Sequence, residues 1–131
     1  MNQTQRQLTL RLPWPPSVNH YWRTARVKRG CQTYVSREGK TYRRRVCDRI
    51  SLAHDDFKAL EGPVGLRILA HAPDARKRDL DNTMKALLDA LQAAGVYTDD
   101  SQICDIHISR RRIIRPDGMV IVTAKEVAYE D

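Results

Sequence analysis

Apolar and polar residues alternate in four stretches of the chain, which is typical of strands with one buried face. The first two predicted strands cover residues 8–12 and 64–70. Two more, at 103–114 and 119–127, are separated by the turn-forming sequence Arg-Pro-Asp-Gly at 115–118. We therefore expect the last two strands to pair as a β-hairpin.

Spacings of three and four between apolar residues predict two helices. The first covers residues 37–60, with Ser36 as its N-cap. Its apolar face contains Tyr42, Val46, Ile50, Ala53, Phe57 and Leu60. The second covers residues 82–94, with Gly95 as its C-terminal cap. Its buried stripe is formed by Met84, Leu87, Leu88 and Leu91.

Residues 17–33 are polar, basic and aperiodic, so we expect a long loop after the strand terminator at 13–16. Four side chains in or beside it could stack on bases, namely Trp14, Asn19, Tyr21 and Trp22. Alternatively, Trp14 belongs to the core. The resulting element order is βαβαββ, which predicts an α+β fold with a mixed sheet and two helices. We expect one domain over residues 1–131.

Basic residues outnumber acidic ones 23 to 16, which gives a formal net charge of +7 and a pI near 9.7. Many lie in four runs, at 23–29, 43–45, 76–78 and 110–115. Such runs favour a polyanionic partner, because each phosphate that is neutralised releases condensed counterions. They also occur on solvated faces of helices and strands, so charge alone does not name the partner.

The cysteines and the apolar runs bear on the compartment. Cys31, Cys47 and Cys104 are widely spaced, which argues against a disulfide framework or a zinc cage and favours a reducing compartment. No apolar run has the length of a signal peptide or a membrane span. We expect a soluble cytoplasmic protein that makes no membrane contact.

The candidate chemistry lies in Asp79-Leu80-Asp81-Asn82 and Lys85. Carboxylates two residues apart project to the same side of an extended segment. Lys85, four residues after Asp81, lies on the same side of the helix as Asp81. Two carboxylates can hold Mg²⁺, which activates water and stabilises a transferring phosphoryl group. A nearby ammonium can neutralise the developing anion.

A purely structural interpretation of these residues is also open. Asp81 could be a helix N-cap, and Asp81 with Lys85 could form an ordinary i,i+4 ion pair. A second acidic pair, Asp99-Asp100, follows the helix and favours a metal site. The two pairs can meet only if residues 96–100 fold back as a strand beside the segment that carries Asp79.

Two segments of the sequence resemble a known family. RKRDLDNTMKALLDALQAAGVYTDDSQI, at 76–103, closely resembles the RusA family of Holliday junction resolvases of bacteria and lambda-like phages. LPWPPSVNHYWR, at 12–23, resembles the segment that follows the first strand in that family. The resemblance covers nearly the whole chain and is most specific in the pattern D-x-D-N-x-x-K-x-x-x-D-A-L. It is weaker at 31–60 and after residue 110.

The resemblance implies a role for each residue of the motif. Asp79, Asp81 and Asp100 match the metal-binding aspartates of the family, and Lys85 matches its catalytic lysine. Asp99 occupies a neighbouring acidic position, as a further ligand or in a supporting role. Asp89 is expected to be a structural ion-pair partner. Asn82 is expected either to orient a carboxylate or, as we favour, to assist the helix cap.

The resemblance also implies the activity and its partners. The expected protein is a homodimeric, Mg²⁺-dependent endonuclease, with Mn²⁺ as a possible substitute. It makes paired symmetric nicks in four-way DNA junctions during recombination and repair, in a bacterial or phage setting close to the nucleoid. The expected DNA-contacting residues are Arg76, Lys77, Arg78, Arg23, Arg43, Arg44, Arg110 and Arg111. The rival hypothesis is a non-catalytic basic DNA-binding module.

Overall fold

The computed structural model describes residues 5–129 and contains a four-stranded mixed sheet. Its strands run in the order β1 (Gln7–Leu12), β6 (Met119–Glu126), β4 (Val64–His71) and β5 (Ile103–Arg110). β6 is antiparallel to both of its neighbours, whereas β4 and β5 are parallel. The α+β class predicted from the sequence is confirmed.

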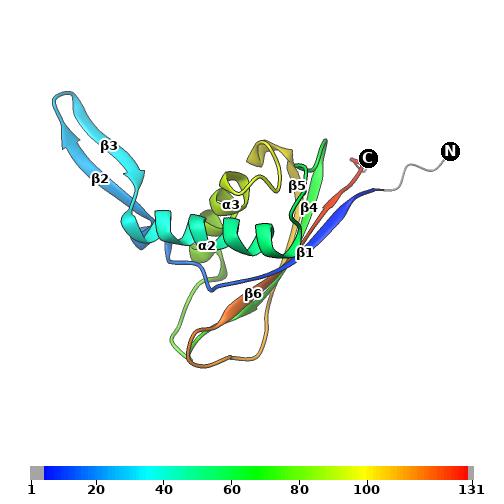
Figure 1. Ribbon diagram of the computed structural model, residues 1–131. Coiled ribbons are helices and arrows are strands. Elements are labelled where there is room, and N and C mark those ends of the chain that lie inside the picture. The colour runs from blue at the N-terminus through cyan, green and yellow to red at the C-terminus, as the bar shows by residue number, and fades with distance from the viewer. Residues whose placement is uncertain (1–4, 130–131) are drawn as a thin grey trace.

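Two long helices, α2 (Arg37–Ala53) and α3 (Met84–Ala93), pack together beside the sheet (Figure 1). In β1 and β6 every second residue is buried, so one face of each strand supplies the core. The helices supply the other half of the core through Tyr42, Val46, Ile50, Met84, Ala86, Leu87, Ala90 and Leu91. Leu88, which was placed in the buried stripe, is only partly buried.

The segment predicted to be a long loop contains regular structure instead. A short helix, α1 (Val18–Tyr21), leads into the antiparallel strands β2 (Trp22–Val27) and β3 (Gly30–Val35). This hairpin extends away from the rest of the molecule (Figure 1). Most of its residues are exposed on both faces, so its strands have no hydrophobic alternation. The loop prediction was therefore wrong.

The first predicted helix begins as expected but ends early. The Ser36 hydroxyl accepts a hydrogen bond from the Gly39 backbone N–H, which confirms Ser36 as the N-cap. α2 stops at Ala53 rather than at residue 60, because Leu60 leaves the helix to form an isolated bridge with Tyr97. The acidic residues at 55–56 would also oppose the negative C-terminal end of a longer helix.

The predicted C-terminal hairpin is also wrong. β6 pairs with β1 and β4, so β4 lies between β5 and β6. β5 ends at Arg110, four residues earlier than predicted. Because parallel neighbours need a crossover, the chain returns from β4 to β5 through η1 (Leu80–Thr83), α3 and η2 (Asp100–Gln102). This crossover carries every motif acid.

Among the helices of residues 5–129, none combines the length and the apolar character needed to span a bilayer.

Candidate active site

Asp79 and Asp81 follow β4 at the edge where the parallel strands β4 and β5 end. Asp79 occupies the position before η1, and Asp81 lies in the first turn of η1. Both residues are exposed. Within residues 5–129, neither carboxylate forms a side-chain hydrogen bond or an ion pair. The two carboxylates are therefore open to an external ligand.

The structural alternative for these acids does not match the geometry. η1 begins at Leu80, so the position before the helix belongs to Asp79 and not to Asp81, and the Asp79 side chain makes no capping hydrogen bond. In the described part of the chain, Asp81 forms no ion pair with Lys85. The cap hypothesis for Asp81 was wrong, so Asn82 has no Asp81 cap to assist.

Basic loops surround the same edge of the sheet. Arg76, Lys77 and Arg78 lie in the loop after β4, and Arg110 and Arg111 end β5 or follow it. The Arg110 guanidinium donates to the backbone carbonyl of Arg78 at 2.8 Å, which ties the two basic segments together. The structure thus gathers five of the predicted DNA-contacting residues beside Asp79 and Asp81.

The exception within this group is Arg78. Its guanidinium donates to both carboxylate oxygens of Asp74, at 2.7 and 3.0 Å, and lies over the ring of Trp14. The hydrogen bonds from Arg78 hold the pKa of Asp74 at about 2. Arg78 therefore fixes the shape of the loop, whereas Arg76 and Lys77 are exposed. Trp14 is partly buried against the core, as the second of its two interpretations required.

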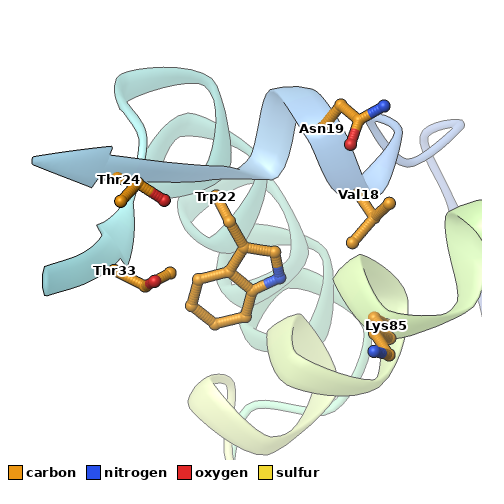
Figure 2. Close-up of a pocket in the computed structure, with 6 residues that line it drawn as sticks. All are labelled: Val18, Asn19, Trp22, Thr24, Thr33 and Lys85. Carbon is orange, nitrogen blue, oxygen red and sulfur yellow. The ribbon is translucent and has the colours of Figure 1, made fainter. Parts of the chain in front are cut away.

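Lys85 lies in the first turn of α3 and is exposed. Its spacing of four from Asp89 places these two residues on one side of α3, and Asp81 lies in the preceding turn, η1. Figure 2 shows Lys85 across a cavity from α1 and the start of the β2–β3 hairpin. The ammonium group is therefore near Asp81 in the chain and accessible from the cavity.

Asp99 and Asp100 lie at the opposite edge, just before β5. The Asp99 carboxylate accepts from the Ser101 backbone N–H at 2.9 Å, and the Gln102 side chain accepts from the Asp99 backbone N–H at 3.0 Å. This reciprocal capping box fixes η2. Gln102 also donates to the Leu60 carbonyl at 3.0 Å, which anchors the turn near the start of β4.

The two acids of this second pair differ in their electrostatics. The hydrogen bond with Asp99 is the largest cause that raises the pKa of Asp100, and burial and the charges of Asp99 and Asp89 add to it. The backbone N–H of Ser101 lowers the pKa of Asp99. Asp99 is thus used in a local structural contact. Asp100 is exposed, and its charged form is disfavoured by a neighbouring carboxylate, which a bound cation would relieve.

The two acidic pairs do not converge within one chain. The Asp100 backbone N–H donates to the Gln92 side chain at 3.0 Å, beside the last turns of α3. About 16 Å of helix separates Gln92 from Asp81. Residues 96–97 lie beside Leu60 rather than beside the Asp79 segment, so the predicted fold-back was wrong. No group of three acidic, histidine or cysteine side chains in residues 5–129 is arranged to hold a metal ion.

Arg43, which was also predicted to contact DNA, is instead part of a hydrogen-bond network inside the protein. Its guanidinium donates to the Asp89 carboxylate and, at 2.9 Å, to the Tyr21 hydroxyl. The Tyr21 hydroxyl also donates to Asp89. This network joins α1, α2 and α3, and it agrees with the structural role expected for Asp89. Arg23 on β2 and Arg44 on α2 are exposed.

Sequence reasoning missed three positioning residues, Asp74, Gln92 and Gln102. Asp74 and Arg78 are four residues apart, which permits an ion pair. Arg78 also belongs to the basic run 76–78, and that run was interpreted as a DNA-binding surface. Gln102 follows Asp99 by three residues, which is the spacing of a capping box and could have been recognised. Gln92 acts across eight residues of chain and leaves no local signal.

Comparison with known proteins places the geometry in context. The sequence profile of the family described as "Endodeoxyribonuclease RusA" matches residues 13–123. "Crossover junction endodeoxyribonuclease RusA" of Escherichia coli (strain K12) is 41% identical over 122 residues, which are 93% of this chain and 97% of that protein. The protein named "Crossover junction endodeoxyribonuclease rusA" from Enterobacteria phage 82 is 40% identical over 119 residues, 91% of this chain and 94% of its own.

The protein of the same name from Enterobacteria phage HK97 is 44% identical over 100 residues, 76% of this chain and 78% of its own. The range matched by the family profile, residues 13–123, contains both acidic pairs and Lys85. The chain belongs to the RusA family of endodeoxyribonucleases.

Proposed function

We propose that this chain is a Holliday junction resolvase, a crossover junction endodeoxyribonuclease that nicks two opposed strands of a four-way DNA junction. One observation carries the proposal. Asp79 and Asp81 are exposed, are unpaired among residues 5–129, and precede Lys85 on one segment that adjoins two basic segments, in a chain that matches the RusA family over residues 13–123. We also propose that residues 1–131 act as one endonuclease domain.

The donor set fits a divalent cation, and we propose Mg²⁺, with Mn²⁺ as a substitute. Exposed carboxylate oxygens are hard ligands of the kind that Mg²⁺ binds while it keeps several waters. When bound, Mg²⁺ lowers the pKa of a coordinated water and offsets charge on the phosphoryl group. Asp79, Asp81 and Asp100 would hold it. Asp99 supports Asp100 through the turn that it caps.

Some of the remaining groups act on the DNA directly, and others hold the binding surface in place. The Lys85 ammonium, a compact charge near Asp81 in the chain, stabilises the negative charge that develops on the phosphate or the leaving oxygen. Arg76, Lys77, Arg110 and Arg111 bind backbone phosphates at the same edge of the sheet, and Arg23 and Arg44 extend this surface. Arg43 holds Asp89 and the base of the hairpin in place. Arg78 positions its loop through Asp74.

We propose a homodimer that both matches the symmetry of the junction and completes each metal site. A four-way junction has approximate two-fold symmetry, so a dimer presents one site to each of two opposed strands. Within residues 5–129 of one chain, Asp100 lies beside Gln92, and about 16 Å of helix separates Gln92 from Asp81. A second copy that brings its own Asp100 to Asp79 and Asp81 of the first would complete a three-carboxylate site.

One observation favours the rival function, a non-catalytic DNA-binding module. The acids of a single described chain, residues 5–129, form two separate pairs rather than one metal centre. Incubation of a synthetic four-way junction with the protein separates the two functions. The resolvase is expected to nick opposed strands with Mg²⁺, to stop with EDTA and to leave linear duplex intact. A junction that is bound but never cut would support the binding module.

A further inference from the structure

A cavity of about 610 Å³ lies between the base of the β2–β3 hairpin and α3 (Figure 2). α1 contributes Val18 and Asn19, the hairpin contributes Trp22, Thr24 and Thr33, and α3 contributes Lys85. Its volume falls within the ~300–1,000 Å³ typical of pockets for small organic ligands. The cavity therefore connects the proposed catalytic lysine to a mixed aromatic and polar surface.

The structure separates the aromatic residues of this segment into different roles. Tyr21 is fully buried, and its hydroxyl is held by Arg43 and Asp89. Trp14 lies under the Arg78 guanidinium. Trp22 is only partly buried. The Trp22 ring packs edge-on against the Tyr21 ring, with the two ring centroids 4.9 Å apart. The Trp22 indole also lines the cavity (Figure 2). Trp22 alone of the three is placed to stack on an incoming ring.

The other lining groups suit a nucleotide. The Asn19 amide and the hydroxyls of Thr24 and Thr33 can donate to and accept from the edge of a base. Thr24 and Thr33 are direct cross-strand partners, so both project from the same face of the hairpin as Trp22. Lys85 supplies a cation for the attached phosphate. In residues 22–35 there are four basic side chains and no acidic one, which also favours a polyanion.

We propose that this cavity binds a single unstacked nucleotide of the DNA junction, with its base against the Trp22 indole and its phosphate toward Lys85. This inference rests on the proposed function and extends it. Junction DNA supplies such a nucleotide where strands exchange, because bases at the crossover can leave their stack. An intact linear duplex does not. The pocket then contributes to the choice of junctions over duplex and places the strand beside Asp81 and Lys85.

Fluorescence of Trp22 tests occupancy without cleavage. In the Trp14→Phe variant, which keeps an aromatic ring beneath Arg78, Trp22 is the one remaining tryptophan. A four-way junction added in EDTA is expected to quench the Trp22 emission. A linear duplex that contains the same base pairs as the junction arms is not expected to quench it. Equal quenching by both, or none by a junction that gel shift shows to be bound, would overturn the proposal.

Variants give the second readout. Trp22→Ala should lower junction affinity or cleavage by about 10- to 100-fold, the scale of stacking one base on an aromatic ring. Trp22→Phe should restore most of it. Tyr34→Ala is the matched control, because Tyr34 is a half-exposed aromatic residue on the opposite face of the same hairpin. Equal losses in Trp22→Ala and Tyr34→Ala would overturn the proposal.

A gentler variant guards against misfolding. Thr33→Val removes one exposed hydroxyl from the cavity and preserves side-chain shape, so it should keep the wild-type melting temperature while weakening junction binding several-fold. Unchanged binding in both Thr33→Val and Trp22→Ala would overturn the proposal. Failure of the proposed function is distinguishable, because it would appear as a wild-type protein that does not cut with Mg²⁺, whereas the quenching needs no cleavage.

Discussion

The two edges of the four-stranded sheet carry the same residue type in different environments. At the edge where β4 and β5 end, Asp79 and Asp81 are exposed and lie among basic loops. At the edge where these strands begin, the Asp99 carboxylate caps a turn by accepting from the Ser101 backbone N–H. The first pair is open to a ligand, whereas half of the second is used to hold the backbone.

This difference follows from the topology. A connection between parallel strands leaves the sheet at one edge and re-enters it at the other, so the two ends of α3 cannot share one edge. Acids at both ends of such a crossover are kept apart in one chain, however close they are in sequence. A site that uses both pairs therefore has to be assembled from two chains.

The largest expected effect comes from the open edge. Asp79→Asn and Asp81→Asn should each reduce junction cleavage by roughly 10²–10³-fold or more, the scale for loss of a group that stabilises transition-state charge. Junction binding should persist, because a neutral side chain repels phosphate less. Single-turnover cleavage and gel shift measure the two effects. Asp105→Asn, an exposed acid on β5 paired only with His107 among residues 5–129, is the control and should cut normally.

The second pair should separate into a catalytic and a structural residue. Asp100→Asn should reduce cleavage by roughly 10²-fold with little change in melting temperature. Asp99→Ala should lower the melting temperature, because η2 loses its cap, and Asp99→Ser should recover both stability and cleavage. An Asp99→Ser protein that folds normally and does not cut would make Asp99 a further metal ligand.

A smaller effect is expected at Lys85. Lys85→Ala should slow cleavage by about 10–100-fold, because a compact charge near the phosphate is lost. Lys85→Arg should recover only part of the rate, since a planar guanidinium places its charge differently. Cleavage rates at saturating DNA test this directly. Wild-type rates in both variants would assign Lys85 to the surface.

The smallest effect is expected in the basic loops. Lys77→Ala should weaken junction binding several-fold and lower the slope of log K against log salt by about 0.9, the value for one phosphate contact. Binding measured between about 50 and 200 mM salt gives this slope. Arg43→Ala should leave the slope unchanged and lower the melting temperature instead, because Asp89 and Tyr21 lose their partner.

Much of the fold was predictable because the main elements bury one face. The periodicities that placed β1, β4, α2 and α3 reflect burial against a single core, and Ser36 and Gly95 mark helix ends by local chemistry. The β2–β3 hairpin lacked such a signal because neither of its faces is buried. The position of β6 between β1 and β4 depends on long-range pairing, which alternation alone does not encode.

The sequence predicted which residues belong to the candidate site, but not how they are arranged in space. The spacing of Asp79, Asp81 and Lys85 is local, so the sequence predicted that they lie on one segment. The distance between Asp81 and Asp100 depends on whether β5 runs parallel or antiparallel to β4, which determines the edge from which the chain returns. Contacts such as Arg43 with Asp89 join distant segments and have no signature in either segment alone.

Subunit mixing tests the central claim, that each metal site combines Asp79 and Asp81 of one chain with Asp100 of another. Asp79→Asn and Asp100→Asn are each expected to be inactive alone. In a 1:1 mixture that has exchanged subunits, about half of the dimers are mixed, and each has one intact site. The mixture should therefore regain about a quarter of the wild-type nicking sites, as single nicks with Mg²⁺. A mixture that contains mixed dimers and remains inactive would contradict the shared site.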